Sequence, residues 1–274
     1  MNFGLIIIGD EILSGKREDK HLPKVIQLLG ARGLGLGWAR YVGDDPARIT
    51  ADLKDAFASG DAVFSCGGIG ATPDDHTRQC AAAALGVPLA LHPTARDLIL
   101  ERMRDTAKEQ GIPYEPDRDD NRHRLNMGVF PEGAEIIPNP YNKIAGFTMR
   151  GSVATLPAGG AVHFVPGFPV MAWPMIEWVL DTHYAHEHTL AGTSERSVIV
   201  YGAMEATLTP LMESIEAQFP GIKVFSLPSV DHPQWGRHIE LGVKGRSAAL
   251  DPAYAELLRG LASHNARLGP ELVR

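Results

Sequence analysis

Short apolar runs alternate with amphipathic segments over residues 1–86. Three of the runs are strand-like and end at a glycine: "NFGLIIIG", "LGWARYVG" and "DAVFSCGG". The first is apolar throughout, which is typical of a strand buried on both faces of a parallel sheet. A segment with helical character follows each run: "KHLPKVIQLLGARG", "DPARITADLKDAFASG" and "TRQCAAAALG". Three strand–helix pairs in succession predict a layered α/β domain with helices on both faces of the sheet.

Side-chain spacing and end signals support these helices. Apolar residues recur at helical spacing at Leu22, Val25, Ile26 and Leu29, and then at Ile49, Leu53 and Phe57. Asp45 is a suitable N-cap for the second helix, and Pro46 suits its first position. The small alanines of the third helix allow close packing on a sheet.

The rest of the pattern divides the chain into two regions. We expect a helix over 93–110, a charged loop or a poorly packed helix start over 112–126, short strands over 127–170 and a closing helix over 170–184. The apolar pattern stops over 185–195, which is therefore the best linker candidate. It restarts in the order β-α-β-β-α, ending with a helix at "DPAYAELLRGLASHNARLG". We therefore expect a first domain over 1–185 and a small α+β domain over 195–274.

Composition excludes some classes of function. The 274 residues carry a formal net charge of −7, which argues against non-specific binding to nucleic acid or acidic membranes. Two cysteines are too few for a disulfide framework and favour a reducing compartment. The first apolar run is short and has no basic leader, so we expect a buried strand rather than a signal peptide or membrane span. These signals together place the protein in the cytoplasm.

Acidic and glycine-rich segments follow the three expected strands, at "GDEILSGK", "VGDD" and "CGGIGATPDD". Ligands bind at the carboxyl ends of strands in an open α/β sheet. Gly67, Gly68 and Gly70 allow a sharp turn that exposes amide groups to an anion, and the next helix adds its positive dipole end. The pattern predicts a phosphate-binding loop, with Asp74 and Asp75 placed to bind Mg²⁺ beside the phosphate.

A purely structural role for the same loop stays open. A βα turn often contains glycine and a capping aspartate without any ligand, and the spacing matches neither a P-loop nor a Rossmann fingerprint. Lys16 can pair with phosphate or lie solvated, and Glu11 can be a metal ligand, a base or a cap. The histidines of "HYAHEH" lack a second ligand cluster for a closed metal site. Cys66 lacks a clear histidine partner that would make it a nucleophile.

Five motifs follow one another along the chain: "IGDEILSGK", "VGDDPARI", "GGIGATPDDHTRQ", "VFPEGAEIIPNP" and "VPGFPVM". Together they resemble the MogA/MoaB-type molybdopterin-binding domains, and specifically the amino-terminal part of the CinA competence/damage-inducible proteins. The resemblance covers roughly residues 3–180, and the module at 196–246 resembles the second domain of the same proteins. It implies a three-layer α/β/α domain with a mostly parallel sheet, whose pocket takes a pterin or a nucleotide with its phosphates.

The resemblance also implies roles for individual residues. Asp75, which closes the glycine loop, and Asp44, after the second strand, match aspartates that serve Mg²⁺–phosphate chemistry, so both are expected catalytic and metal-binding residues. The implied ligand-binding positions are Gly9, Asp10, Glu11, Ser14, Gly67, Gly68, Gly70, Thr72, Asp74, Asn139, Pro166 and Gly167. Mg²⁺ is the implied cofactor, molybdopterin is a candidate ligand, and a homo-oligomer, with a dimer favoured, is the implied assembly.

Relatives of this kind adenylylate molybdopterin or are associated with metal-dependent hydrolysis of ADP-ribose. Both reactions hold a diphosphate, neutralise its charge and position an attacking oxygen. We therefore expect a protein that binds a phosphorylated nucleotide or molybdopterin and that can hydrolyse a nucleotide pyrophosphate. The alternatives are a non-catalytic molybdopterin-binding protein linked to molybdenum cofactor biosynthesis, and an interaction module with a vestigial pocket.

The sequence departs from the family pattern at positions that would face the pterin or base. Ala71 stands where the family usually has proline, and Asp19-Lys20-His21 stands where it has Asp-Thr-Asn. Phe168 interrupts the family's Pro-Gly-Pro-Pro, and no proline precedes Gly146. The phosphate and metal positions are retained, so these departures concern the organic part of the ligand.

Overall fold

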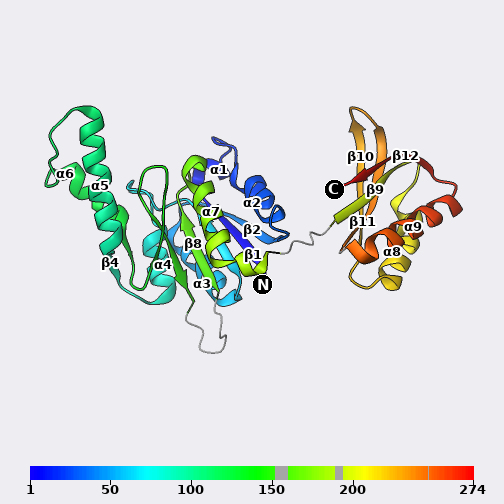
Figure 1. Cartoon of the computed structure of the whole chain (residues 1–274), viewed down its shortest axis with the longest axis horizontal. Helices are drawn as coiled ribbons and strands as arrows, with labels where there is room; N and C mark the ends of the chain where they lie inside the picture. Colours follow the sequence, from blue (N-terminus) through cyan, green and yellow to red (C-terminus); the bar gives the residue numbers. More distant parts are fainter. Residues whose placement is uncertain (152–159, 189–193, 246) are drawn as a thin grey trace. The chain divides into compact units, whose positions relative to one another are not determined.

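The computed structural model describes residues 1–151, 160–188, 194–245 and 247–274. The packing of the chain defines two compact units, Met1–His188 and Thr189–Arg274. Each unit has its own main sheet (Figure 1). The strand expected at "SVATLPAGG" lies outside the described residues, apart from Gly160.

The first unit is built on a six-stranded sheet in the order β2-β1-β3-β8-β7-β6. Its strands are β1 (Phe3–Ile8), β2 (Leu36–Val42), β3 (Ala62–Cys66), β6 (Glu135–Ile137), β7 (Gly146–Arg150) and β8 (Ala161–Val165). Strands β2, β1, β3 and β8 run parallel, whereas β7 and β6 are antiparallel to their neighbours. The predicted mostly parallel sheet is confirmed.

Helices cover both faces of this sheet (Figure 1). On one face α2 (His21–Gly30) and α7 (Pro169–His183) pack against Phe3, Leu5 and Ile7 of β1. On the other face α3 (Pro46–Ser59) and α4 (Thr77–Leu85) share a core with Ile6 and Ile8 of β1. Successive residues of a strand point to opposite faces, so a strand covered on both sides must be apolar throughout. This explains the unbroken apolar run at the start of the chain.

Helix ends follow the predicted signals, with one correction inside α2. The Asp45 side chain accepts a hydrogen bond of 2.7 Å from the Arg48 amide, and Pro46 occupies the first turn of α3. Ile26, expected on the buried stripe of α2, is 51% exposed, and Leu28 is buried instead. The helix begins at His21, so the face toward the sheet carries positions 21, 25, 28 and 29, and Ile26 falls outside it.

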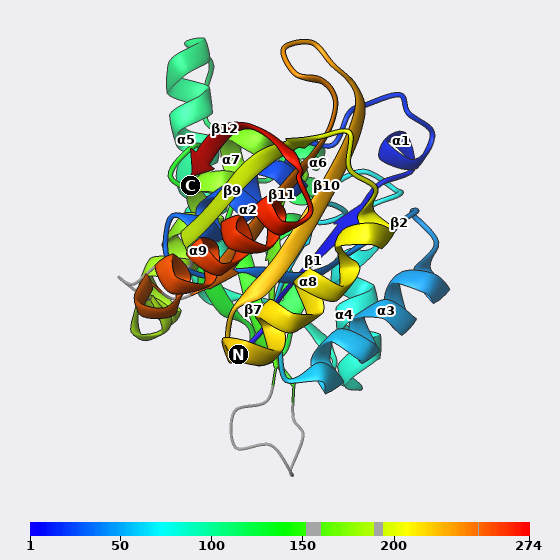
Figure 2. The ribbon, with the colours of Figure 1, turned by 90° about the vertical axis from the view of Figure 1, so that its right-hand side faces the viewer.

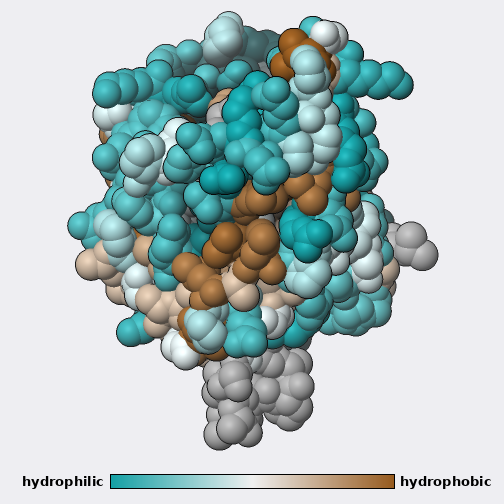
Figure 3. All heavy atoms as spheres, turned by 90° about the vertical axis from the view of Figure 1, so that its left-hand side faces the viewer, coloured by the Kyte–Doolittle hydropathy of each residue, from teal (hydrophilic) through white to brown (hydrophobic). Residues whose placement is uncertain are grey.

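The remaining elements of the first unit are short, except for one long helix. They are α1 (Asp10–Leu13), β4 (Leu89–Leu91), α5 (Pro93–Gln110), α6 (Asp119–Leu125), η1 (Asn126–Gly128), β5 (Val129–Pro131) and η2 (Ala185–Glu187). The face that carries α5 is mostly hydrophilic and is crossed by a hydrophobic band (Figure 3). Leu89 and Leu91 of β4 are among the exposed apolar residues of the unit. In the part of the chain that the structure describes, no helix is both long and apolar enough to span a membrane.

The second unit is an antiparallel four-stranded sheet in the order β10-β11-β9-β12, with two helices on one face (Figure 2). Its elements are β9 (Ser194–Tyr201), α8 (Glu205–Gln218), β10 (Lys223–His232), β11 (Gly236–Gly245), α9 (Ser247–Ser263) and β12 (Arg267–Val273). The sequence interpretation extended the last helix too far and missed β12. The helix ends at Ser263, Asn265 adopts a left-handed φ of 53°, and the tail then pairs with β9.

Candidate functional site

The site lies where the four parallel strands of the first unit end. Because β2, β1, β3 and β8 are parallel and neighbours, their carboxyl ends share one edge of the sheet. The segments that follow these strands surround a cavity of about 450 Å³, which we call the main cavity. The Gly9 amide donates to the Val42 carbonyl at 3.0 Å, which ties the loops after β1 and β2 together.

The glycine loop after β3 has a backbone that only glycine adopts easily. Gly67 has a φ of 108° and Gly68 a φ of 68°, both in the left-handed range. A Cβ atom at Gly67 would collide with the Ile8 carbonyl oxygen, and one at Gly68 with the Thr77 hydroxyl. The sequence therefore places glycines where the fold leaves no space for a side chain.

One backbone amide of the glycine loop donates a structural hydrogen bond, and three others donate none among the described residues. The Gly67 amide donates to the Val165 carbonyl at 3.0 Å and so anchors the loop to β8. The amides of Gly68, Ile69 and Gly70 donate no hydrogen bond to any residue that the structure describes, and all three residues line the main cavity. Unpaired amides at a glycine turn are a common way to hold an anion.

Asp75 fixes the far end of the loop. Its Oδ2 accepts from the Thr72 amide at 2.8 Å and from the Thr72 hydroxyl at 2.5 Å. A Cβ atom on Gly70 would lie 2.6 Å from the same oxygen, so the carboxylate packs closely against the loop. Asp75 thus lines the main cavity with one oxygen engaged in loop structure.

Carboxylates gather around Asp44, which also lines the main cavity. The Asp10 amide donates to Asp44 Oδ2 at 2.9 Å, and the Asp44 amide donates to Asp10 Oδ1 at 3.1 Å. Burial raises the pKa of Asp44, and repulsion from Asp10, Glu11 and Asp74 adds to this, against the lowering effect of the Asp10 amide. A cation near Asp44 would relieve this repulsion.

Among the described residues, the carboxylates of the main cavity do not form a complete metal site by themselves. Within the described ranges, no group of three or more His, Cys, Asp or Glu side chains is placed to hold a metal ion. Mg²⁺ is commonly bound by one or two carboxylates together with substrate phosphates and water. Asp44 and Asp75 are therefore suitable for Mg²⁺ only when a phosphorylated ligand supplies further oxygens.

A buried arginine lies beneath the glycine loop, and the sequence interpretation did not include it. Arg78, in the first turn of α4, donates to the Ile69 carbonyl at 2.9 Å and is almost fully buried. Burial lowers the pKa of its guanidinium, while the Asp75 carboxylate opposes that effect. Arg78 holds Ile69 and places positive charge under the loop.

Most of the predicted site residues meet in one place. The main cavity is lined by Gly9, Glu11, Asp44, Gly67, Gly68, Gly70, Thr72, Asp74, Asp75, Pro166 and Gly167. Asp10 supports Asp44 from outside the lining, and Ser14 is exposed after α1. The Asn139 side chain is buried and donates to Asn142 and Ile144, so it shapes a turn whose residue Asn142 lines the cavity. Lys16 is exposed and lines neither this cavity nor its neighbour.

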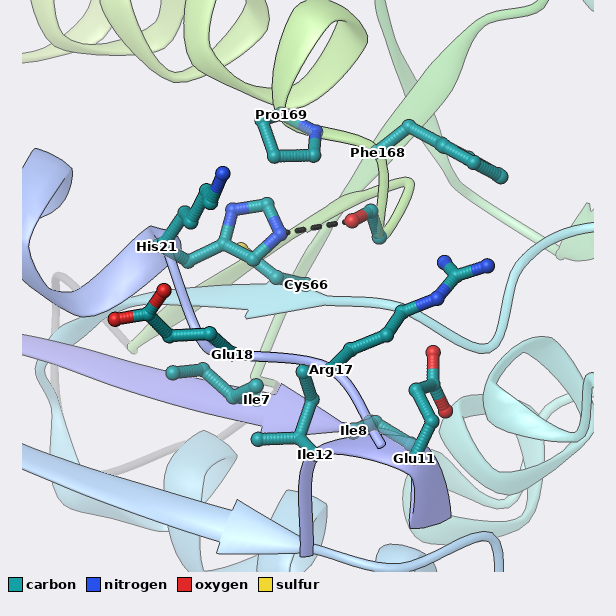
Figure 4. Close-up of a pocket in the computed structure, with 12 residues that line it drawn as sticks. Ile7, Ile8, Glu11, Ile12, Arg17, Glu18, His21, Cys66, Phe168 and Pro169 are labelled. Carbon is teal, nitrogen blue, oxygen red and sulfur yellow. Dashed lines mark hydrogen bonds between the residues drawn. The ribbon is translucent and has the colours of Figure 1, made fainter. Parts of the chain in front are cut away.

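A second cavity of about 380 Å³ adjoins the main one. The two share the lining residues Ile8, Glu11, Arg17, Gly167 and Phe168. Arg17, Glu11 and Phe168 lie at one end of the second cavity, with His21 and Glu18 at the other (Figure 4). His21 Nε2 donates to the Gly167 carbonyl at 2.9 Å, which ties the start of α2 to the loop after β8.

Two other candidates of the sequence do not add chemistry to the site. Cys66 and Cys80 are free and buried, and burial raises the pKa of both thiols, so neither is activated as a thiolate. His183 lies in α7 and His186 in a short 3₁₀ turn, and no metal-holding group includes them among the described residues.

The fold and the position of the site define an α/β protein with a small-molecule site at the carboxyl ends of parallel strands. Residues 4–186 match the family model described as a probable molybdopterin binding domain. The chain therefore belongs to this family.

Individual relatives agree with this assignment. The chain is 34% identical over 182 residues to a CinA-like protein of Anaeromyxobacter sp. (strain K), covering 66% of this chain and 40% of that protein. It is 28% identical over 226 residues to a CinA-like protein of Syntrophotalea carbinolica, covering 80% of this chain and 51% of that protein. The chain thus spans about half or less of these two relatives.

A solved structure has the same fold. The crystal structure of the protein CinA from Thermoplasma acidophilum matches with a TM-score of 0.53 and 24% identity, covering 66% of this chain and 98% of that one. At this level of identity the similarity concerns the fold alone. It agrees with the mixed α/β architecture and mostly parallel sheet of the first unit.

Proposed function

We propose that the first unit binds a small molecule that carries one or more phosphates, and that these phosphates lie on the glycine loop. The observation that carries this proposal is the set of unpaired amides at Gly68, Ile69 and Gly70, which line the main cavity. The buried Arg78 beneath the loop and the exposed Arg17 on the cavity wall add positive charge. Together these groups suit an anion of high charge density.

The organic part of this ligand is a pterin or a nucleoside. The family description, a probable molybdopterin binding domain, supports the pterin. The size of the main cavity, about 450 Å³, is in the range of small-molecule and cofactor sites. We propose molybdopterin as the first candidate ligand and a nucleotide as the second.

We further propose that Mg²⁺ binds together with the ligand, and that Asp44 and Asp75 would hold it. When bound, Mg²⁺ would neutralise negative charge on the phosphate groups. Burial is the main cause of the raised pKa of Asp44, and repulsion from Asp10, Glu11 and Asp74 adds to it. A cation would reduce that repulsion, which supports this role. Asp10 orients Asp44 through its amide, and Thr72 orients Asp75.

Calorimetric titration of the chain with pyrophosphate, with and without Mg²⁺, tests binding. We expect saturable binding that strengthens when Mg²⁺ is added, and loss of the Mg²⁺ effect in Asp75→Asn. Asp97→Asn is the matched control, because Asp97 lies in α5 and lines neither cavity. Absence of pyrophosphate binding under both conditions would overturn the proposal.

Hydrolysis of a nucleotide pyrophosphate such as ADP-ribose is the second candidate function. The carboxylates on the wall of the main cavity favour it, because one that does not bind Mg²⁺ can accept a proton from an attacking water. We expect Mg²⁺-dependent release of AMP from ADP-ribose that Asp75→Asn abolishes. Equal turnover by both proteins would refute the site, and binding without turnover would identify a non-catalytic binding protein.

A further inference from the structure

Phe168 stands between the main cavity and the second cavity. Phe168 lines both cavities, and it is 55% exposed. The Arg17 Cζ atom lies 5.9 Å from the centre of the ring, which is cation–π distance. Arg17 itself lines both cavities and forms no ion pair with a residue that the structure describes. A free guanidinium and an exposed aromatic ring therefore stand together where the cavities join.

The fold does not require an aromatic side chain at this position. Phe168 is the N-cap residue of α7, with φ −87° and ψ 119°, and its side chain makes no capping hydrogen bond. An exposed Phe ring without a packing or capping role leaves apolar surface in contact with water, which is unfavourable. Ligand contact would account for its presence at the cavity edge.

The second cavity has the walls that a flat heterocycle needs. Ile7, Ile12, Cys66 and Pro169 give it apolar sides. Glu18, which forms no ion pair among the described residues, places a carboxylate acceptor at the end away from Phe168 (Figure 4). The N–H groups of an amino-substituted ring would donate to such a carboxylate.

We propose that the second cavity holds the planar nitrogen heterocycle of the ligand, stacked on Phe168, while the phosphates lie on the glycine loop. Arg17 then lies between ring and phosphates, with its charge available to the diphosphate. This inference rests on the proposed function for the phosphate end, and adds that Phe168 determines preference for the organic end. The ring is a pterin or a purine.

Calorimetric titration of the full chain in the presence of Mg²⁺ distinguishes binding of the ring from binding of the phosphates. The probes are pyrophosphate, ADP, 6-hydroxymethylpterin diphosphate and adenosine. Phe168→Ala should weaken binding of ADP or of the pterin diphosphate about tenfold, the usual scale of one lost stacking contact, and leave pyrophosphate unchanged. The probe with the larger loss identifies the ring.

Matched variants distinguish the π face of Phe168 from its apolar area and from the nearby charge. Phe168→Leu keeps apolar area but removes the π face, so it should weaken the ring-bearing probe nearly as much as Phe168→Ala. Val170→Ala should have no effect, because Val170 is 52% exposed in the same helix and lines neither cavity. Arg17→Gln should weaken pyrophosphate and ADP alike, whereas Lys16→Gln, which removes a charge outside both cavities, should not.

The possible outcomes test the stacking site and the phosphate site separately. Equal affinity for ADP, pterin diphosphate and pyrophosphate, unchanged by Phe168→Ala, would overturn the stacking site and leave the phosphate site intact. Binding of adenosine that Phe168→Ala weakens, with no binding of pyrophosphate, would support stacking and overturn the phosphate site. Failure of all four probes to bind would overturn both.

Discussion

The glycine loop and the second cavity adjoin one another but are built from different parts of the polypeptide. The loop presents backbone amides, and its shape depends on two left-handed glycines that have no room for a side chain. The second cavity presents side chains from β1, the segment before α2, β3 and the start of α7. One half of the site is therefore set by backbone conformation, and the other half by side-chain identity.

This difference teaches what each half can recognise. Backbone amides bind any phosphate, because they contact oxygens that all such ligands share. In the proposed complex, side chains such as Phe168 and Glu18 would contact the part that distinguishes one ligand from another. We therefore expect substitutions in the loop to affect all ligands, and substitutions in the second cavity to affect only ligands with a ring.

The largest effect is expected from Gly68→Ala. The new Cβ would collide with the Thr77 hydroxyl at a backbone φ of 68°, so the loop must change shape. We expect a loss of about 2–4 kcal/mol in unfolding free energy, and roughly a hundredfold weaker binding of both pyrophosphate and ADP. Chemical denaturation and calorimetric titration measure the two quantities.

Gly86→Ala is the control for backbone strain alone. Gly86 ends α4 with a φ of 69°, yet a Cβ there would meet nothing within 4 Å. It should cost about 1 kcal/mol of stability and leave binding unchanged. Equal pyrophosphate affinity in Gly68→Ala and Gly86→Ala would contradict the claim that the backbone of the glycine loop binds phosphate.

An intermediate effect is expected from His21→Ala. The substitution removes the hydrogen bond of 2.9 Å to the Gly167 carbonyl and leaves a gap at a residue that is 4% exposed. We expect about 2 kcal/mol lower stability, and ADP binding weakened about threefold because the loop that carries Phe168 loses its tether. The affinity for pyrophosphate should not change.

His21→Asn tests the reason for that effect. An asparagine keeps an amide donor near the same carbonyl, so it should recover part of the ADP affinity. Equal losses for pyrophosphate and ADP in His21→Ala would show that the two cavities do not act separately.

The smallest effect is expected from Asp44→Asn on stability. Burial and neighbouring carboxylates raise the pKa of Asp44 above 3.8, so its ionised form is disfavoured in the folded state. The native protein then holds this proton more tightly than the unfolded chain, and stability falls as pH rises through the window above 3.8. Asn removes the charge but keeps an acceptor for the Asp10 amide.

The unliganded variant should therefore melt roughly 1–2 °C higher than the wild type at pH 7. The gain should vanish below pH 3.8, where both forms are uncharged. Scanning calorimetry at several pH values follows the trend, with Asp97→Asn as the control. A lower melting temperature at pH 7 would show that the carboxylates are not in repulsion without ligand.

The α/β fold class and the glycine loop could be predicted because each depends on residues that are close together in the sequence. The unbroken apolar run of β1 reflects burial on both faces, and Asp45 with Pro46 marks the start of α3, so the α/β class followed directly. The glycines of the loop could be found because their backbone conformation is a local property.

Contacts between distant parts of the chain account for what was missed. Strand β12 exists because it pairs with β9, some seventy positions earlier, and its sequence alone reads as the end of a helix. Arg17 and Phe168 meet only because β1 and β8 end at the same edge of the sheet, separated by β3. The resemblance marks Phe168 as a departure from the family motif, but no local pattern indicates that Arg17 lies beside its ring.

The N-cap of α7 has a consequence for how this protein can diverge. Because the Phe168 side chain neither makes a capping hydrogen bond nor packs in the core, a single codon change there can replace it with another aromatic, aliphatic or polar group while the fold remains intact. If the glycine loop holds phosphate as proposed, copies of the gene that keep this loop would be able to change ligand preference through residue 168 alone.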